Sequence, residues 1–231
     1  MITVRLASER GKTALDWLHS QHTFSFADYY DDKHMNFGPL RVINEDVIAP
    51  GKGFDAHSHS DMEIITYVIY GAVEHKDSLG TGAVIHKGEI QRMSAGTGVT
   101  HSEFNHSKTD PLHLLQIWII PERRGLPASY EQKKLNFIPN QWQVVADHAD
   151  TNGALKIHQN VTLLAATIKN KQKLSYSPRK GTAWLQVVRG SITIGNIKAK
   201  AGDGLAIVSE PNFDILANTD SEVLLFDIQT T

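Results

Sequence analysis

Short apolar runs, separated by glycines and polar turns, dominate the hydrophobic pattern of the chain. Segment 64–70 is rich in β-branched and aromatic residues, and segment 112–120 is almost continuously apolar. Runs of this length and composition predict buried β-strands. Segment 2–6, which alternates apolar and polar residues, and segment 40–48, which is followed by Pro50 and Gly51, predict further strands. Segment 128–134, which begins next to a proline, predicts one short helix. We therefore expect an all-β fold with little helix.

The second half of the chain repeats the pattern of the first half. The apolar run 67–70 ends at a glycine, and so does the run 186–189. Each run leads through a short predicted strand to a glycine–acid pair, at 88–89 in the first half and at 202–203 in the second. A repeated order of strands and turns indicates two similar β-domains.

A change of character at 121–139, which is charged and contains prolines, predicts the linker between the two domains. We therefore expect a first domain over 1–134 and a second over 135–231. The last histidine of the chain is His158, which precedes the core of the second repeat. The core of the second repeat therefore has no histidine with which to build the histidine site of the first.

Two pairs of side chains with metal-binding chemistry stand in the first half, each pair at positions i and i+2. They are His57 with His59 and His101 with Glu103. Residues two apart on a strand point to the same face of the sheet. If the two strands are neighbours, three imidazoles and one carboxylate converge, and such a mixed set suits a divalent transition metal.

The two pairs stand inside a frame of glycines at 51, 71, 88 and 96. Further characteristic sequence motifs occur at 22–26, 37–42, 62–68, 77–80, 91–96 and 101–103. These glycines and motifs resemble those of the cupin superfamily and, within it, those of the pirin family. The resemblance is strongest to enterobacterial pirin-like proteins with quercetin 2,3-dioxygenase activity. The spacing from Glu63 to Gly71 and the serine at 94 depart from the common cupin pattern, as they do in pirins.

The resemblance implies a bicupin, two β-barrel (jelly-roll) domains of which only the first holds metal. It implies the ligand set His57, His59, His101 and Glu103, and it leaves Glu63, the ligand in many cupins, in a supporting or structural role. The ion is one divalent transition metal, Fe, Cu, Mn, Co, Ni or Zn, because the ligands do not fix its identity. Other histidines are expected to be hydrogen-bonded or surface residues, namely His19, His22, His34, His75, His86, His106, His113, His148 and His158.

The activity that the resemblance implies is a dioxygenase that opens the ring of a flavonol such as quercetin with O2 and releases CO. In this scheme Glu103 also accepts the proton of the flavonol 3-hydroxyl. Two alternatives remain open. One is a metal-binding regulatory module with a protein partner, and the other is a cupin enzyme acting on another small substrate, because a fold does not fix a function.

The charge and composition of the chain limit which partners and which cellular location we expect. A net charge of -2 gives no electrostatic reason to expect nucleic acid or an anionic membrane as a partner. The absence of cysteine excludes disulfides and thiolate metal sites. No apolar run approaches the roughly 20 residues that span a bilayer, and the N-terminus lacks the apolar core of a signal peptide. We therefore expect a cytoplasmic protein.

Overall fold

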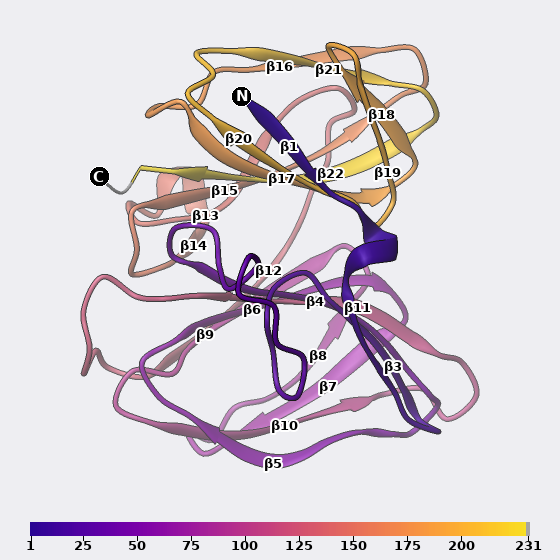
Figure 1. The fold of residues 1–231 in the computed structure, drawn as a ribbon. Coiled ribbons are helices and arrows are strands. Elements are labelled where there is room, and N and C mark those ends of the chain that lie inside the picture. Colours follow the sequence, from indigo (N-terminus) through magenta and orange to yellow (C-terminus); the bar gives the residue numbers. More distant parts are fainter. Residues whose placement is uncertain (230–231) are drawn as a thin grey trace. The chain divides into compact units, whose positions relative to one another are not determined.

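The computed structural model describes residues 1–229, and almost all of its regular structure is β (Figure 1). The helical segments in this range are two 3-10 turns, η1 (Ala7–Glu9) and η2 (Thr151–Gly153). The all-β prediction is confirmed. No helix within these residues is long and apolar enough to cross a bilayer, and the cytoplasmic location stays a prediction.

The chain forms two compact units. The N-terminal unit comprises Gly11–Leu135 with Ile157–Gln159. Its strands are β2 (Gly11–Ala14), β3 (Leu18–His22), β4 (Leu40–Ile48), β5 (Gly53–His59), β6 (Glu63–Tyr70), β7 (Ala72–Asp77), β8 (Gly82–His86), β9 (Glu89–Ser94), β10 (Val99–Asn105), β11 (Leu112–Ile119) and β12 (Ser129–Lys134).

Two sheets enclose the core of the N-terminal unit. The larger sheet has the order β12-β9-β6-β11-β4-β3-β2, and the smaller has the order β5-β10-β7-β8. One core cluster joins Val68 and Leu112 of the larger sheet to Val73 and Ile85 of the smaller one. The two sheets therefore face each other (Figure 1), and side chains from both contribute to this cluster.

The C-terminal unit comprises Met1–Arg10, Asn136–Lys156 and the chain from Asn160 onward. Its strands are β1 (Ile2–Arg5), β13 (Gln143–Asp147), β14 (Leu155–Lys156), β15 (Val161–Ile168), β16 (Lys173–Tyr176), β17 (Thr182–Arg189), β18 (Ser191–Ile194), β19 (Ile197–Lys200), β20 (Gly204–Val208), β21 (Phe213–Ala217) and β22 (Ser221–Ile228). The sheet orders are β1-β20-β17-β22-β15-β13-β14 and β16-β21-β18-β19.

The two units have equivalent topologies, as the sequence repeat predicts. Strand β17 occupies in its sheet the place that β6 occupies in the other, and β20 corresponds to β9. The glycines that follow β6 and β17, Gly71 and Gly190, both adopt positive φ angles, 82° and 79°. Few residues other than glycine tolerate this conformation, so the repeated glycines mark the same turn.

The helix predicted at 128–134 is wrong, because these residues form the edge strand β12. It pairs with β9 from Ser129, opposite Ser94, to Lys134, opposite Glu89. Glu131 also forms an ion pair with Arg92 at 2.8 Å. A helix this short is marginal in water, and the backbone hydrogen bonds of an open sheet edge outweigh its weak propensity.

The compact units also differ from contiguous domains over 1–134 and 135–231. Residues Met1–Arg10 belong to the C-terminal unit, because β1 pairs with β20 and the Ala7 N–H donates to Asp203 Oδ1. Ile157–Gln159 belongs to the N-terminal unit, where the Glu122 N–H donates to the His158 carbonyl. In the sheet order β1 holds the place that β12 holds in the N-terminal sheet.

Candidate active site

Three of the predicted ligands lie together on the smaller sheet of the N-terminal unit. Strands β5 and β10 are antiparallel neighbours, and His101 lies directly opposite His57. The ring centroids are 4.5 Å apart for His57 and His101, 4.8 Å for His57 and His59, and 5.0 Å for His59 and His101. One nitrogen from each ring lies within 4.8 Å of the others. The i, i+2 spacing and the strand pairing together produce this convergence.

The chemical state of these histidines fits a metal ion. His101 is buried, and neither of its ring nitrogens has a hydrogen-bond partner among the described residues. Burial and the neighbouring His57 lower the pKa of His101 to about 3, and burial with His57 lowers that of His59 to about 4. Both rings are therefore neutral at pH 7, which is the form that binds a metal. Buried nitrogens without partners are costly unless a ligand satisfies them.

Glu103 is buried beside these histidines and is held by three neutral donors. Its Oε1 accepts hydrogen bonds from Thr66 Oγ1 at 3.1 Å and Gln91 Nε2 at 2.9 Å, and its Oε2 accepts one from Gln116 Nε2. Burial raises the pKa of Glu103 to about 7, and the charge of Asp46 acts in the same direction. The carboxyl is therefore close to half-ionised near neutral pH.

Glu103 belongs to a second group of possible ligand atoms, with His75 and His101, and all three side chains are buried. His101 is shared between this group and the three-histidine group. A register shift between His101 and Glu103 interrupts the pairing of β10 with β5. The structure thus brings His57, His59 and His101 into one group and Glu103 into a second group that shares His101 with the first.

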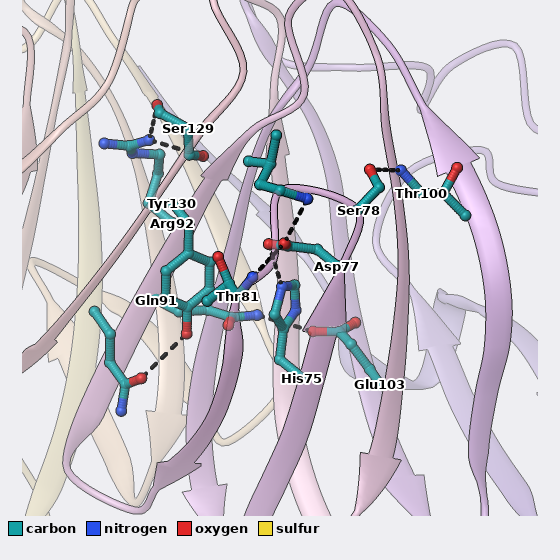
Figure 2. Close-up of polar contacts among 12 residues, drawn as sticks. His75, Asp77, Ser78, Thr81, Gln91, Arg92, Thr100, Glu103, Ser129 and Tyr130 are labelled. Atoms are coloured by element: carbon teal, nitrogen blue, oxygen red, sulfur yellow. Dashed lines mark hydrogen bonds and ion pairs between the residues drawn. The ribbon is translucent and has the colours of Figure 1, made fainter.

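His75 is a close neighbour of the site that sequence reasoning did not identify (Figure 2). Its Nε2 donates to Asp77 Oδ2 at 3.0 Å, its ring lies 4.9 Å from that of Tyr130, and its Nδ1 has no partner among the described residues. The ring lies 5.3 Å from that of His101. His75 is hydrogen-bonded, as expected, but its place opposite Glu103 follows from the pairing of β7 with β10, which no sequence motif indicated.

Glu63, the rival carboxylate, lies outside both groups of possible ligands. It is buried, accepts a hydrogen bond from Ser94 Oγ at 2.8 Å, and pairs with His158 Nδ1 at 3.2 Å. Its neighbour Ile64 lines the cavity described below, so Glu63 points to the other face of β6. These contacts fit a structural role for Glu63, in which it binds Ser94 and His158 and not a metal ion.

A cavity of about 540 Å³ opens onto the histidines. Its volume is in the range of sites that hold drug-sized ligands. Four aromatic side chains line it, Trp17, Phe26, Phe54 and Trp118. Its polar lining, apart from the three histidines, Glu103 and Asp55, consists of Thr13, Ser20, His22, Asn44, Asp46 and Gln116. Sequence reasoning expected a loop or packing role for His22, and the cavity-lining residues Ser20, Asn44 and Asp46 on β3 and β4 carried no motif.

Comparison with known proteins agrees with this geometry. The Pirin family model matches residues 3–119, and the model of the quercetinase C-terminal cupin domain matches residues 144–228. The chain is 49% identical over 229 residues to the quercetin 2,3-dioxygenase of Escherichia coli (strain K12), covering 99% of each chain.

Solved structures show the same fold. A crystal structure of the bacterial pirin YhhW from Escherichia coli in complex with nickel(II) matches with a TM-score of 0.96 and 47% identity, covering 100% of both chains. A quercetin 2,3-dioxygenase structure from Acinetobacter baumannii shares the fold at 23% identity, with a TM-score of 0.80 over 98% of this chain and 85% of that chain. With its first half matching the pirin model and its full length matching a close relative, the chain belongs to the pirin family of cupin proteins.

Proposed function

We propose that this chain is a metal-dependent dioxygenase that opens the ring of a flavonol such as quercetin with O2 and releases CO. The observation that carries the proposal is the cluster of three histidines at the wall of a cavity lined by aromatic residues. The Escherichia coli relative that matches over nearly its full length is a quercetin 2,3-dioxygenase. Aromatic side chains offer flat apolar contact surfaces, which suit a fused-ring aromatic ligand.

We propose that His57, His59 and His101 hold one divalent metal ion, with Glu103 as the fourth ligand. When bound, such an ion supplies Lewis acidity to an oxygen atom of the substrate. His59 and His101, whose pKa values are lowered, require no proton release before they bind metal. The carboxylate of Glu103 adds a negative charge that offsets the charge of the ion.

Glu103 is also suited to accept the proton of the flavonol 3-hydroxyl. Burial raises the pKa of Glu103 to about 7 in the absence of metal. A bound cation favours the ionised form, so the carboxyl is a carboxylate that can accept a proton at neutral pH. The hydrogen bonds from Thr66, Gln91 and Gln116 fix the orientation of the carboxyl. Loss of the proton gives an electron-rich enolate, the form of the flavonol that reacts with dioxygen.

The lining of the cavity favours a neutral aromatic substrate over a small carboxylic acid. Among the described lining residues there is no lysine or arginine, while Asp46, Asp55 and Glu103 contribute carboxylates. An oxalate-like dianion would meet these acids without a side-chain cation to pair with it. A cavity of about 540 Å³ beside the histidines also supports a small-molecule substrate more than it supports a protein partner.

The test is turnover of quercetin by the purified protein of known metal content, with and without oxygen. We expect one CO released per flavonol consumed, in the presence of O2 only. Because quercetin also oxidises slowly by itself, the matched control is His101→Ala protein at the same concentration. Flavonol loss at equal rates in both proteins, or loss without CO, would reject the proposal.

A further inference from the structure

A second buried carboxylate, Asp46, faces the cavity without a complete set of hydrogen bonds. It lies on β4 and is 3% exposed. The Ser20 hydroxyl on β3 hydrogen-bonds to its carboxyl, while Oδ1 has no partner among the described residues. A buried acceptor without a hydrogen bond destabilises the folded state by about 1–3 kcal/mol. A ligand that donates a hydrogen bond to Oδ1 would remove this cost.

Among the described residues, no lysine or arginine acts on this carboxylate. The strand partners of Asp46 are Ser20 on β3 and Leu114 on β11. The ionisable groups whose charges act on it are Glu45 on its own strand and His113 on β11, and His113 hydrogen-bonds to Glu45 at 2.9 Å. Glu103 on β10 is close enough for the charge of Asp46 to raise its pKa. Packing therefore does not account for an acid at this position.

The other polar groups on this wall of the cavity bind one another. His22 Nδ1 lies 2.8 Å from Asn44 Oδ1, and His22 Nε2 lies 2.9 Å from Thr13 Oγ1. Asp46 Oδ1, by contrast, has no partner among the described residues, and on the adjacent strand β11 the same holds for Gln116 Oε1. Because β3 and β4 belong to the larger sheet and the histidines to the smaller one, Asp46 and the histidines lie on facing walls of one cavity.

We propose that Asp46 is a specificity-determining residue that binds a second hydroxyl group of the flavonol, remote from the 3-hydroxyl at the histidines. This inference rests on the proposed function. A phenolic hydroxyl both donates and accepts, so it pairs with the carboxyl in either protonation state. A methyl ether cannot donate, and a flavonol without a second hydroxyl leaves Oδ1 buried and unpaired. The site therefore selects polyhydroxylated flavonols.

The test compares quercetin with 3-hydroxyflavone, which carries the 3-hydroxyl alone, in wild-type and Asp46→Asn proteins. For each pair of ligands we would measure the ratio of kcat/KM with O2 and the ratio of Kd without O2. We expect both ratios to shift against quercetin by about 10-fold or more in the variant. The control is Glu63→Gln, which changes a buried carboxylate outside the cavity lining and should leave both ratios unchanged.

Unchanged ratios in Asp46→Asn would overturn the inference. If wild-type protein turns over neither flavonol but the anaerobic Kd ratio shifts as expected, the dioxygenase proposal fails and the Asp46 assignment stands. A second measurement needs no variant and so does not depend on Asp46→Asn folding. Wild-type protein should bind quercetin methylated at one particular hydroxyl about 10-fold more weakly or worse, and equal binding of all mono-methylated quercetins would also overturn the inference.

Discussion

Glu103 and Glu63 are both buried carboxylates of the N-terminal unit, yet their partners differ. Glu103 lines the cavity and accepts hydrogen bonds from three uncharged side chains. Glu63 pairs with Ser94 and His158 on the other face of its strand. The common cupin pattern makes Glu63 a ligand, but these surroundings favour Glu103.

Glu103→Gln is expected to lower flavonol turnover by about 10²-fold or more, the usual scale for a general base. The variant should keep a substantial fraction of its metal, because glutamine retains an oxygen ligand. Higher pH should partly restore the rate, since the substrate hydroxyl then ionises without help. Metal content and initial rate against pH measure both effects. If Glu63→Gln empties the site and Glu103→Gln is nearly wild type, the carboxylate has been assigned wrongly.

A substitution of His75 tests which of the two groups of possible ligand atoms holds the ion, because His75 belongs to only one of them. His75→Phe preserves an aromatic ring beside Tyr130 but removes the donor to Asp77. The loss of that buried hydrogen bond should lower the free energy of unfolding by about 1–3 kcal/mol. Metal content should remain at the wild-type level, because we place the ion at His57, His59 and His101. Denaturant unfolding and metal analysis test this, and loss of the metal would place the ion at His75, His101 and Glu103.

The pairing of β5 with β10 builds the site, and a glycine permits it. A Cβ atom on Gly53 would lie 2.2 Å from the Glu103 carbonyl oxygen and 2.5 Å from the Phe104 Cα. Both are backbone atoms, which cannot move without separating the strands. Gly82, on β8, offers a matched control because nothing lies within 4 Å of its Cβ position.

Gly53→Ala should therefore lower both metal affinity and the free energy of unfolding, the latter by about 1–3 kcal/mol as for an overpacked core. Gly82→Ala should change neither quantity appreciably. Metal titration and denaturant unfolding of both variants provide the measurement. Equal behaviour of the two variants would mean that the close approach of β5 and β10 does not set the geometry of the site.

Elements that carry a local pattern could be predicted from the sequence, and those that depend on a distant partner could not. The i, i+2 spacing placed His57 and His59 on one face, and the apolar run of β11 indicated a doubly buried strand. Strand β1 was predicted as a strand of the first domain but pairs with β20 of the C-terminal unit. Strand β12 was predicted as a helix but pairs with β9. Both depend on the strand beside them. Asp46 and His75 reach the site through sheet pairing, for which a single sequence holds no signal.

The two units share one topology but fill their interiors differently. In the C-terminal unit β16 pairs with β21, as β5 pairs with β10. The side chains there are apolar, with Phe213 and Ile215 in the core and Leu174 and Tyr176 packed against it. Where the first unit has histidines and a cavity, the second has a packed core. We therefore expect the N-terminal unit alone to bind a transition metal.

The buried Asp46 also affects the stability of the whole molecule as pH changes. Burial raises the pKa of Asp46 from 3.8 to about 6. The charge of Glu45 also raises it, and the hydrogen bond from Ser20 lowers it. A carboxyl with a raised pKa binds more protons in the folded state than in the unfolded state across this interval, so its contribution to stability falls as pH rises from about 4 to 6. The shift corresponds to at most about 3 kcal/mol.

Asp46→Asn should therefore gain stability over wild type as pH rises from 4 to 7, by up to about 3 kcal/mol. The charged groups that act on Asp46 or respond to it, namely Glu45, Glu103 and His113, are present in both proteins. The difference therefore reports the titration of Asp46 together with its effect on the pKa of Glu103, and both change stability in the same direction. Denaturant unfolding of the two metal-free proteins across this range measures it. A difference independent of pH would show that Asp46 does not titrate in this interval.

The most direct test of the account is a metal titration of metal-free protein in which flavonol turnover and CO release are measured at each step. We predict that both rise in proportion to added metal and stop at one equivalent per chain. Protein with His57, His59, His101 and Glu103 all replaced should bind no stoichiometric metal and show no turnover. Turnover that is indifferent to metal, a requirement for two equivalents, or stoichiometric metal in the fourfold variant would contradict a single metal centre at these residues.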